Sequence, residues 1–273
     1  MNTQIIAEIG WNHMGNEILA EEMVKAAVSS GATIVKFQYW DPQFLIKGDW
    51  DSDGRREIYN NAALNEEKII NLQKICKKYK IDFLISVFGT RGAKKIKNLG
   101  IKNIKIPSHE VANKKLIKFC AENFEEIFFS SGASTEEDVK YANDIFKKSC
   151  VDYCLMHCIS SYPCPSEKTN LPRLKWLKDL HERVGFSDHS QSVITPSLSL
   201  SFGVSAVEKH FTTNKALPGR DNKFALDAEE FSQMVSYIRE TENTLIDHGK
   251  NFIDIENDTV TNYRGRWEPH DYE

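Results

Sequence analysis

The sequence predicts an α/β fold, a single-domain (β/α)8 TIM barrel with eight parallel strands. Short apolar segments alternate with segments of helical apolar spacing along the chain, and this alternation is typical of parallel strands joined by right-handed helical crossovers. Eight strand–helix pairs fit between residues 5 and 245 of the 273-residue chain, which favours a closed barrel over an open sheet. Since no G-x-G-x-x-G sequence follows the first strand, a dinucleotide-binding fold is disfavoured.

Strands are expected wherever four to six mainly apolar or β-branched residues occur together. These segments are residues 5–9, 33–38, 82–86, 103–106, 126–130, 152–157, 184–187 and 205–210. Helices are expected between them, at residues 17–30, 65–79, 91–99, 113–123, 134 onward, 171–181, 194–202 and 228–245. Asn65 and the segment Ser134-Thr135-Glu136-Glu137 have the composition of helix caps, whereas residues 39–64 are expected to form a long loop.

The alternation of apolar and helical segments stops after the last predicted helix, so the chain is divided there into two parts. Residues 1–249 are expected to form the catalytic barrel, and residues 250–273 a C-terminal tail rather than a domain. The tail is polar and aromatic, with Arg264, Arg266, Trp267, His270 and Tyr272.

Composition excludes several classes of protein. With 41% hydrophobic and 27% charged residues, the chain is neither disordered nor of low complexity. Thirty-five Lys and Arg against 39 Asp and Glu give a formal net charge of −4, which predicts no nucleic-acid or membrane partner. No apolar run reaches the ~20 residues of a membrane span, and no signal peptide is visible, so a cytoplasmic location is expected.

The last four of the six cysteines are spaced C-x3-C-x3-C-x5-C, from Cys150 to Cys164. This spacing is not that of zinc or common iron–sulfur sites. Residues four apart on a strand are separated by about 13 Å, too far for a shared metal. We therefore expect reduced thiols that mainly pack in the core.

Polar residues stand near the carboxyl ends of nearly every predicted strand, where a parallel barrel strand is otherwise apolar. They are Glu8, Asn12, His13, Lys36, Gln38, Ser86, Lys105, Ser108, Glu110, Ser130, Ser131, His157, Ser160, Ser187, Asp188, His189, Glu208, Lys209 and His210. Active sites of such barrels lie at this end. A buried charge needs a partner, so a single pair of charges could be a structural ion pair. Charges on five or more strands are not explained in this way and predict a shared anion and metal site.

The residue types suggest which chemistry this site performs. Lys36 and Lys105 suit a phosphate or carboxylate, although pairing with Glu8 and Glu110 as solvated rim charges is the alternative. The small-residue turn that begins with Ser130 and Ser131 suits phosphate binding by backbone N–H groups. His189 and His210 end neighbouring strands beside the acids Asp188 and Glu208, and two imidazoles near carboxylates suit a divalent transition metal.

Many of these residues stand in longer motifs. Residues 6–15 read I-A-E-I-G-W-N-H-M-G, residues 105–110 read K-I-P-S-H-E, and residues 155–165 read L-M-H-C-I-S-S-Y-P-C-P. Shorter motifs are V-K-F-Q at 35–38, G-F-S-D-H at 185–189, E-K-H-F-T at 208–212 and P-G-R-D at 218–221. In this order, over about residues 5–225, they resemble the sialic acid (N-acetylneuraminate) synthase family, with Arg220 where the family has proline.

The resemblance implies a transferase that condenses phosphoenolpyruvate with an N-acylamino sugar aldehyde, N-acetylmannosamine or a related hexose. The products would be a sialic-acid-like nonulosonic acid and phosphate. It further implies a divalent metal, usually Mn²⁺ and otherwise Mg²⁺ or Co²⁺, bound by His189 and His210. Asp188 would orient the metal ligands, and Glu8 and Glu110 would be the acid–base and water-positioning carboxylates.

The resemblance also implies which residues bind the two substrates. Phosphoenolpyruvate would be held at or near Lys36, Gln38, Ser86, Lys105, Ser108, Ser130, Ser131 and Ser187. The sugar would contact Tyr162 and Asp221.

Typical members of this family carry a C-terminal antifreeze-like domain that reaches over the partner's barrel in a dimer. The sequence ends at Glu273, so the barrel is expected without that domain. A homodimer, a separate lid-domain chain, or Arg264 and Arg266 of the tail would then complete the site. Two alternatives remain beside the leading function: a 3-deoxy-ulosonate synthase that uses a sugar phosphate, and a sugar-binding barrel without turnover.

Overall fold

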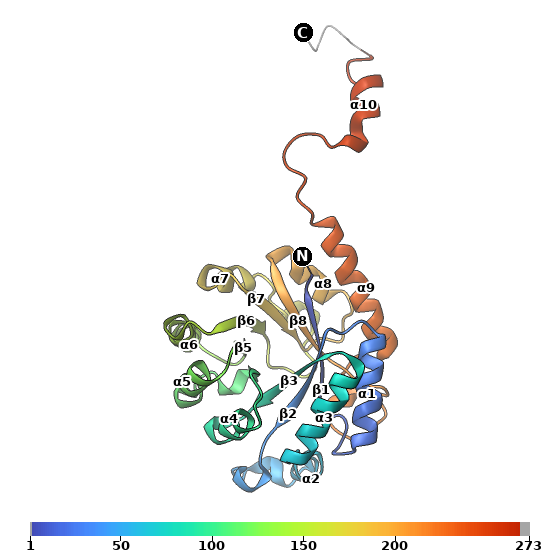
Figure 1. The fold of residues 1–273 in the computed structure, drawn as a ribbon. Helices are drawn as coiled ribbons and strands as arrows, with labels where there is room; N and C mark the ends of the chain where they lie inside the picture. The colour runs from blue at the N-terminus through green and yellow to red at the C-terminus, as the bar shows by residue number, and fades with distance from the viewer. Residues whose placement is uncertain (1, 268–273) are drawn as a thin grey trace.

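Eight parallel strands close into a barrel in the order of the sequence, from β1 to β8 and back to β1 (Figure 1). The computed structural model describes residues 2–267. The strands are β1 (Gln4–Gly10), β2 (Ile34–Tyr39), β3 (Asp82–Val87), β4 (Asn103–Ile106), β5 (Glu126–Ser130), β6 (Asp152–Cys158), β7 (Val184–Asp188) and β8 (Val204–His210). This is the TIM barrel that the sequence predicts, and each strand lies within one or two residues of its expected bounds.

Helices surround the barrel on its outer side (Figure 1). They are α1 (Glu17–Ser29), α2 (Arg55–Ala62), α3 (Glu66–Tyr79), α4 (Gly89–Asn98), α5 (Lys114–Asn123), α6 (Glu136–Ser149), α7 (Arg173–Leu180), α8 (Thr195–Ser199) and α9 (Ala228–Thr244), with α10 (Asn257–Asn262) near the end of the chain. Short 3-10 turns are η1 (Pro42–Phe44), η2 (Asp49–Asp51), η3 (Ser108–Glu110), η4 (Ser166–Lys168), η5 (Leu200–Phe202), η6 (Asp221–Lys223) and η7 (Asp254–Glu256).

Two helix starts are capped as the sequence predicts. The Asn65 side chain accepts a hydrogen bond from the Lys68 N–H, which satisfies one of the unpaired donors of the first turn of α3. Thr135 and Asp138 form a reciprocal capping box at the start of α6. Each cap of this kind stabilises a helix by roughly 1 kcal/mol.

Two segments differ from expectation. Residues 39–64, expected as a loop, contain η1, η2 and α2. The sequence of α2 is mostly polar, and the helix is held by packing: Ala62 is buried with Trp11 and Trp40, and Ile58 and Tyr59 pack against them. The single helix expected at 194–202 is split into the five-residue α8 and η5.

The barrel interior is divided into an apolar floor and a polar mouth. Inward-facing residues at the floor form one buried cluster: Ile6, Ile34, Leu84, Phe128, Cys154, Met156 and Ala206. A larger apolar core fills the space between the strands and the surrounding helices. Burying each large side chain of these cores stabilises the fold by roughly 1.5–3 kcal/mol. Since the floor is filled, polar residues near the carboxyl ends of the strands meet above it.

The chain leaves the barrel after α9. An extended segment leads to η7 and α10, and Figure 1 shows α10 away from the barrel. Ile255 and Trp267 of this segment are exposed, whereas His270 and Tyr272 lie outside the described residues. Between residues 2 and 267, no helix combines the length and the apolar character that crossing a bilayer requires.

Candidate active site

A cavity of about 840 Å³ opens at the carboxyl ends of the strands. All but two of the fifteen predicted site residues line it. They are Glu8, Lys36, Gln38, Ser86, Lys105, Ser108, Glu110, Ser130, Tyr162, Ser187, His189, His210 and Asp221. The exceptions are Ser131 and Asp188. A cavity of this size takes two small substrates together.

A buried network of four charged side chains forms the deepest part of the polar region. Lys36 Nζ lies 3.1 Å from Glu8 Oε2 and 3.2 Å from Glu208 Oε1, and it donates to Ser86 Oγ at 2.9 Å. Lys105 Nζ lies 2.8 Å from Glu208 Oε2. The alternative that the lysines form a solvated rim is wrong, because all four charged side chains are at least 94% buried.

Glu208 is central to this network, whereas the sequence analysis placed it only as the acid beside His210 and expected no contact between it and the lysines. It is the partner of Ser187 in the register of β7 and β8, and Ser187 Oγ donates to its Oε1 at 3.1 Å. The signal was present in the sequence: alternate residues of a strand share a face, so Glu208 faces the same way as His210.

The two buried carboxylates have opposite pKa shifts. Burial raises the pKa of Glu8 from 4.5 to about 7, despite the opposing charge of Lys36. Burial also acts on Glu208, but the charges of Lys105 and Lys36 outweigh it and hold its pKa below the ordinary value. Glu208 is therefore a fixed negative charge at neutral pH, whereas Glu8 is able to gain or lose a proton.

Gln38 positions the Glu8 carboxylate. Its Nε2 donates to Glu8 Oε1 at 2.5 Å. The strand pairing slips between Glu8 and Gly10, which has φ +56°. A Cβ at Gly10 would lie 3.1 Å from Glu8 Oε1 and 3.2 Å from Gln38 Nε2. Glycine at this position therefore leaves room for the contact.

A second part of the cavity wall is built from small polar residues after β4 and β5. The Gly132 N–H donates to Ser108 Oγ at 3.1 Å. A Cβ at Gly132 would lie 2.5 Å from Ser160 Oγ and 2.7 Å from Ser108 Oγ, so the hydroxyls approach the backbone only because glycine is there. The buried Ser130 hydroxyl faces the cavity and makes no hydrogen bond within residues 2–267. Ser108 and Ser130 of this wall line the same cavity as the two lysines.

The two predicted histidines face each other across the cavity mouth, with ring centroids 5.5 Å apart. His189 Nδ1 is hydrogen bonded to the Ile159 carbonyl at 2.8 Å, which leaves Nε2 as the free acceptor nitrogen when Nδ1 carries the proton. Burial lowers the pKa of His210 well below its ordinary value. The Tyr162 ring lies against His189 at 4.0 Å between centroids.

The imidazole pair fits a divalent metal as a partial ligand set. His210 Nδ1 lies 3.6 Å from Asp221 Oδ2 and makes no hydrogen bond within the described residues, so a buried acceptor nitrogen is left without a donor. In the described part of the chain, no three His, Cys, Asp or Glu side chains converge closely enough to hold a metal alone. Two imidazoles would therefore supply two ligands and leave other positions open for water and substrate oxygens.

Comparison with known proteins agrees with this geometry. The NeuB family profile matches residues 23–250. The chain belongs to the NeuB family. It is 34% identical over 262 residues to the N,N'-diacetyllegionaminic acid synthase of Legionella pneumophila, covering 90% of this chain and 74% of that one. It is 31% identical over 271 residues to the pseudaminic acid synthase of Campylobacter jejuni, with coverages of 94% and 78%.

A solved structure of similar fold is the N-acetylneuraminic acid synthetase of Leptospira borgpetersenii in complex with citrate. It superposes with a TM-score of 0.89 at 27% identity and covers 98% of this chain and 93% of that one. The protein is thus a NeuB-family enzyme of the nonulosonic acid synthase type, which condenses phosphoenolpyruvate with a sugar. Enzymes of the NeuB family are metal dependent.

Asp188 does not occupy the position expected for it in this NeuB-family site. Its carboxylate points away from the cavity and pairs with Lys209 at 2.6 Å. Asp188 does not line the cavity, because it alternates with Ser187 along β7 and so faces the helices. Its expected role in orienting the metal ligands stays a prediction. Ser131 also lies behind the wall, where its hydroxyl donates to the Met156 carbonyl at 3.1 Å.

Glu110 lies at the edge of the NeuB-family cavity. Its carboxylate accepts a hydrogen bond from Asn113 Nδ2 at 2.7 Å, just before α5. Asp221 and Arg220 also line the cavity. Burial raises the pKa of Asp221 to about 6.

The cysteines are all free thiols, and five of the six are buried. Within residues 2–267 they form no group of metal-binding side chains. Cys158 is more than core packing, because its Sγ lies 3.7 Å from His189 Nδ1 and lines the cavity.

Proposed function

We propose that this enzyme joins phosphoenolpyruvate to the aldehyde carbon of an N-acylamino hexose, giving a nonulosonic acid and inorganic phosphate. The observation that carries the proposal is the meeting, in one cavity, of three features: two lysines, a wall of serine hydroxyls and an open pair of imidazoles. Residues 1–249 would form the catalytic unit.

Phosphoenolpyruvate would bind at the lysine network. Lys36 and Lys105 would contact its phosphate and carboxylate groups, with Ser86, Ser108 and Ser130 as hydrogen-bond donors. Lysine suits this task as a compact point charge with three donors. Glu208 holds both ammonium groups in place through its two oxygens, Oε1 toward Lys36 and Oε2 toward Lys105, so the cationic site is built before the ligand arrives.

The C–C bond would form between C3 of phosphoenolpyruvate and the aldehyde carbon, using the electron pair of the C2–C3 double bond. This leaves positive charge at C2, next to the two buried carboxylates. Water then adds to C2 and loses its proton to Glu8, whose pKa of about 7 suits this transfer. The aldehyde oxygen, which takes the carbonyl electron pair when the C–C bond forms, becomes a hydroxyl by taking the proton that Glu8 received from the water. The bond between C2 and the phosphate oxygen then breaks as the C2 hydroxyl becomes the ketone and passes its proton to the departing phosphate, which the lysines stabilise as it leaves.

His189 and His210 would hold a divalent cation. When bound, such an ion polarises the aldehyde oxygen of the sugar and makes its carbon more electrophilic. Tyr162 lies against both imidazoles, and Asp221 lies beside His210. These two residues would therefore contact the sugar next to its aldehyde end.

The test is phosphate release from phosphoenolpyruvate in the presence of Mn²⁺ and a panel of sugars. The panel contains N-acetylmannosamine, a diacylamino hexose and a sugar phosphate without an acylamino group. We expect stoichiometric phosphate and 2-keto acid with at least one acylamino sugar. Release with the sugar phosphate alone would favour the 3-deoxy-ulosonate alternative, and release with none would contradict the proposal.

A further inference from the structure

The final residues of β7 and β8 alternate between the cavity and the outer side of the barrel. Ser187 and Glu208 are register partners and face the cavity; Asp188 and Lys209 are the next pair and face outward. His189 and His210 come one position later and face the cavity again. The outward pair therefore lies directly between two pairs that belong to the site.

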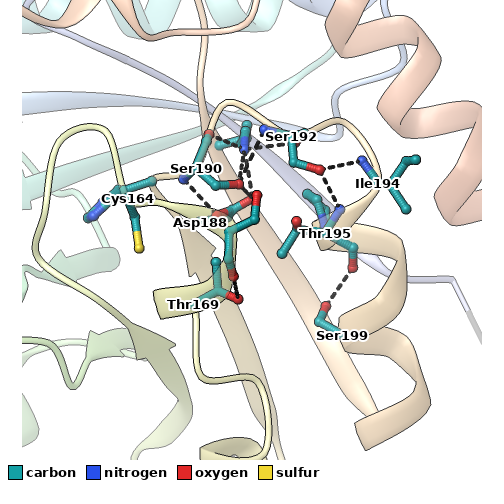
Figure 2. Close-up of polar contacts among 12 residues, drawn as sticks. Cys164, Thr169, Asp188, Ser190, Ser192, Ile194, Thr195 and Ser199 are labelled. Carbon is teal, nitrogen blue, oxygen red and sulfur yellow. Dashed lines mark hydrogen bonds and ion pairs between the residues drawn. The ribbon is translucent and has the colours of Figure 1, made fainter.

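Asp188 and Lys209 form a closed set of contacts around the backbone of His189. Lys209 Nζ lies 2.6 Å from Asp188 Oδ2, on one side of His189, and 2.5 Å from the Ser190 carbonyl on the other. Asp188 Oδ1 accepts a hydrogen bond from the Ser190 N–H at 2.8 Å. Figure 2 shows Asp188, Ser190 and Ser192 gathered at this turn.

The same contacts reach the following helix and the preceding loop. Lys209 Nζ also donates to the Ser192 carbonyl at 3.0 Å. Ser192 Oγ accepts from the Thr195 N–H at the start of α8 (Figure 2). On the other side, the Cys164 N–H donates to the His189 carbonyl at 2.9 Å. The backbone on both sides of His189 is thus fixed from three elements.

This cluster is sealed from the cavity and from water. Asp188 is 1% exposed and Lys209 is 2% exposed. An ion pair so far from water is a costly way to gain stability alone. Its position, one residue from each imidazole on adjacent strands, is what distinguishes it from other ion pairs of the barrel.

We propose that Asp188 and Lys209 are positioning residues that hold His189 and His210 at the separation and orientation needed to bind a divalent metal. This inference rests on the proposed metal role of the two histidines. Lys209 fixes the β8 side and Asp188 the β7 side, so their contact sets one imidazole against the other. Groups behind metal ligands commonly change affinity by about 10–100-fold when they are removed.

The experiment measures the dissociation constant of Mn²⁺ for the metal-free protein, by the electron paramagnetic resonance signal of free Mn²⁺. The variants are Asp188→Asn and Lys209→Met, which keep side-chain shape but remove the ion pair. The matched control is Arg183→Met with Glu126→Gln, an ion pair at the opposite end of the barrel beside β7. Thermal unfolding is recorded for every variant.

We expect Asp188→Asn and Lys209→Met to weaken Mn²⁺ binding by about 10–100-fold, while the control pair leaves it within about twofold. Should all these variants weaken binding in proportion to lost thermal stability, the positioning role is overturned in favour of a structural one. Should the first two variants not fold, Ser190→Ala decides. It removes a hydroxyl that donates to Asp188 Oδ2 at 2.9 Å and accepts from Lys209 Nζ at 3.3 Å, so it loosens both members of the pair, and unchanged Mn²⁺ affinity in it would overturn the inference.

His189→Ala and His210→Ala separate failure of the inference from failure of the proposed site. If these two lose Mn²⁺ binding while Asp188→Asn and Lys209→Met retain it, the metal site stands and the positioning role is wrong. If His189→Ala and His210→Ala both bind Mn²⁺ like the wild type, the proposed metal site is wrong and the positioning role falls with it.

Discussion

Lys105 and Lys209 are both buried lysines paired with a carboxylate, but they lie on opposite sides of the barrel wall. Lys105 Nζ contacts Glu208 at 2.8 Å inside the cavity, and Glu208 is shared with Lys36. Lys209 Nζ contacts Asp188 at 2.6 Å outside the cavity, and its other donors reach the Ser190 and Ser192 carbonyls. The inner lysine lines the cavity, whereas the outer lysine does not and contacts only other groups of the protein.

This difference separates a binding group from a fixed one. An anion that enters the cavity can approach the inner lysines, because they line it. The outer lysine has no such access, since it is absent from the cavity lining and its donors are already used. A buried charge at the carboxyl end of a barrel strand therefore indicates a site only when it faces inward.

The largest effect on turnover is expected from replacing the two histidines that would hold the metal in the cavity. His189→Ala and His210→Ala should each lower metal-dependent turnover about 1000-fold or more, because polarisation of the aldehyde contributes several kcal/mol to the transition state. The measurement is phosphate release against Mn²⁺ concentration. His181→Gln is the control, because His181 bonds to the Tyr153 carbonyl away from the cavity. Wild-type turnover in either alanine variant would contradict the metal assignment.

Protein stability should depend more on the outer lysine, Lys209, than on the inner lysine, Lys105. Lys209→Met leaves Asp188 buried without a cation, which should cost about 3 kcal/mol or more of unfolding free energy. Lys105→Met should cost less, since Glu208 keeps Lys36 at 3.2 Å. Denaturant unfolding of both variants measures the difference. A greater loss in Lys105→Met would show that the outer pair is not the more structural of the two.

The barrel was predictable because strand and helix periods differ and eight pairs fill the chain. Motif positions also predicted eleven of the cavity-lining side chains, and the strand-end residues Ser86 and Ser130 bring the number to thirteen. The sequence analysis did not predict correctly which strand residues face the cavity. Asp188 was assigned to the site as a neighbour of His189, although adjacent strand residues face opposite ways. Glu208 was expected only as an acid near the metal, although it faces the cavity and contacts both Lys36 and Lys105.

Helix α2 shows a different limit of sequence reasoning. Its eight residues, Arg55–Ala62, are mostly polar, so this segment was expected to be part of a loop. The helix forms where Trp11 and Trp40 give Ala62 and its neighbours a surface to pack on. Tertiary contacts of this kind come from segments distant in sequence, and local propensity does not reveal them.

Affinity for phosphoenolpyruvate should depend on Lys105 and not on Lys209, the reverse of the order expected for stability. Lys105→Met should raise the KM for phosphoenolpyruvate by about 10–100-fold, because a hydrogen bond to a charged group contributes about 1.5–3 kcal/mol. Lys102→Met is the matched control: it lies three residues away and pairs with Glu125 on the surface. Steady-state kinetics at saturating sugar and Mn²⁺ give the comparison. An unchanged KM in Lys105→Met would remove this lysine from the anion site.

The smallest effect is a shift in the pH dependence of turnover. It concerns the proton on Glu8, which belongs to the buried network of Lys36, Lys105, Glu8 and Glu208 inside the cavity. If ionised Glu8 accepts the proton of water, kcat/KM should rise with pH through about 7, the pKa that burial gives this carboxyl. Gln38→Met removes the hydrogen bond that stabilises the ionised form, so the rise should move to higher pH. The expected shift is about 0.5–1 pH unit, from a bond of about 1 kcal/mol.

Ser187→Ala is the control for this shift, because Ser187 donates to Glu208 and not to Glu8. Its pH–rate curve should keep the midpoint of the wild type even where its rate is lower. A midpoint that stays at about 7 in Gln38→Met, or that moves to lower pH, would assign the titrating group to a residue other than Glu8. A midpoint that moves only in Gln38→Met would tie the proton transfer to the inner network, since the Asp188–Lys209 pair makes no contact with Gln38 or Glu8.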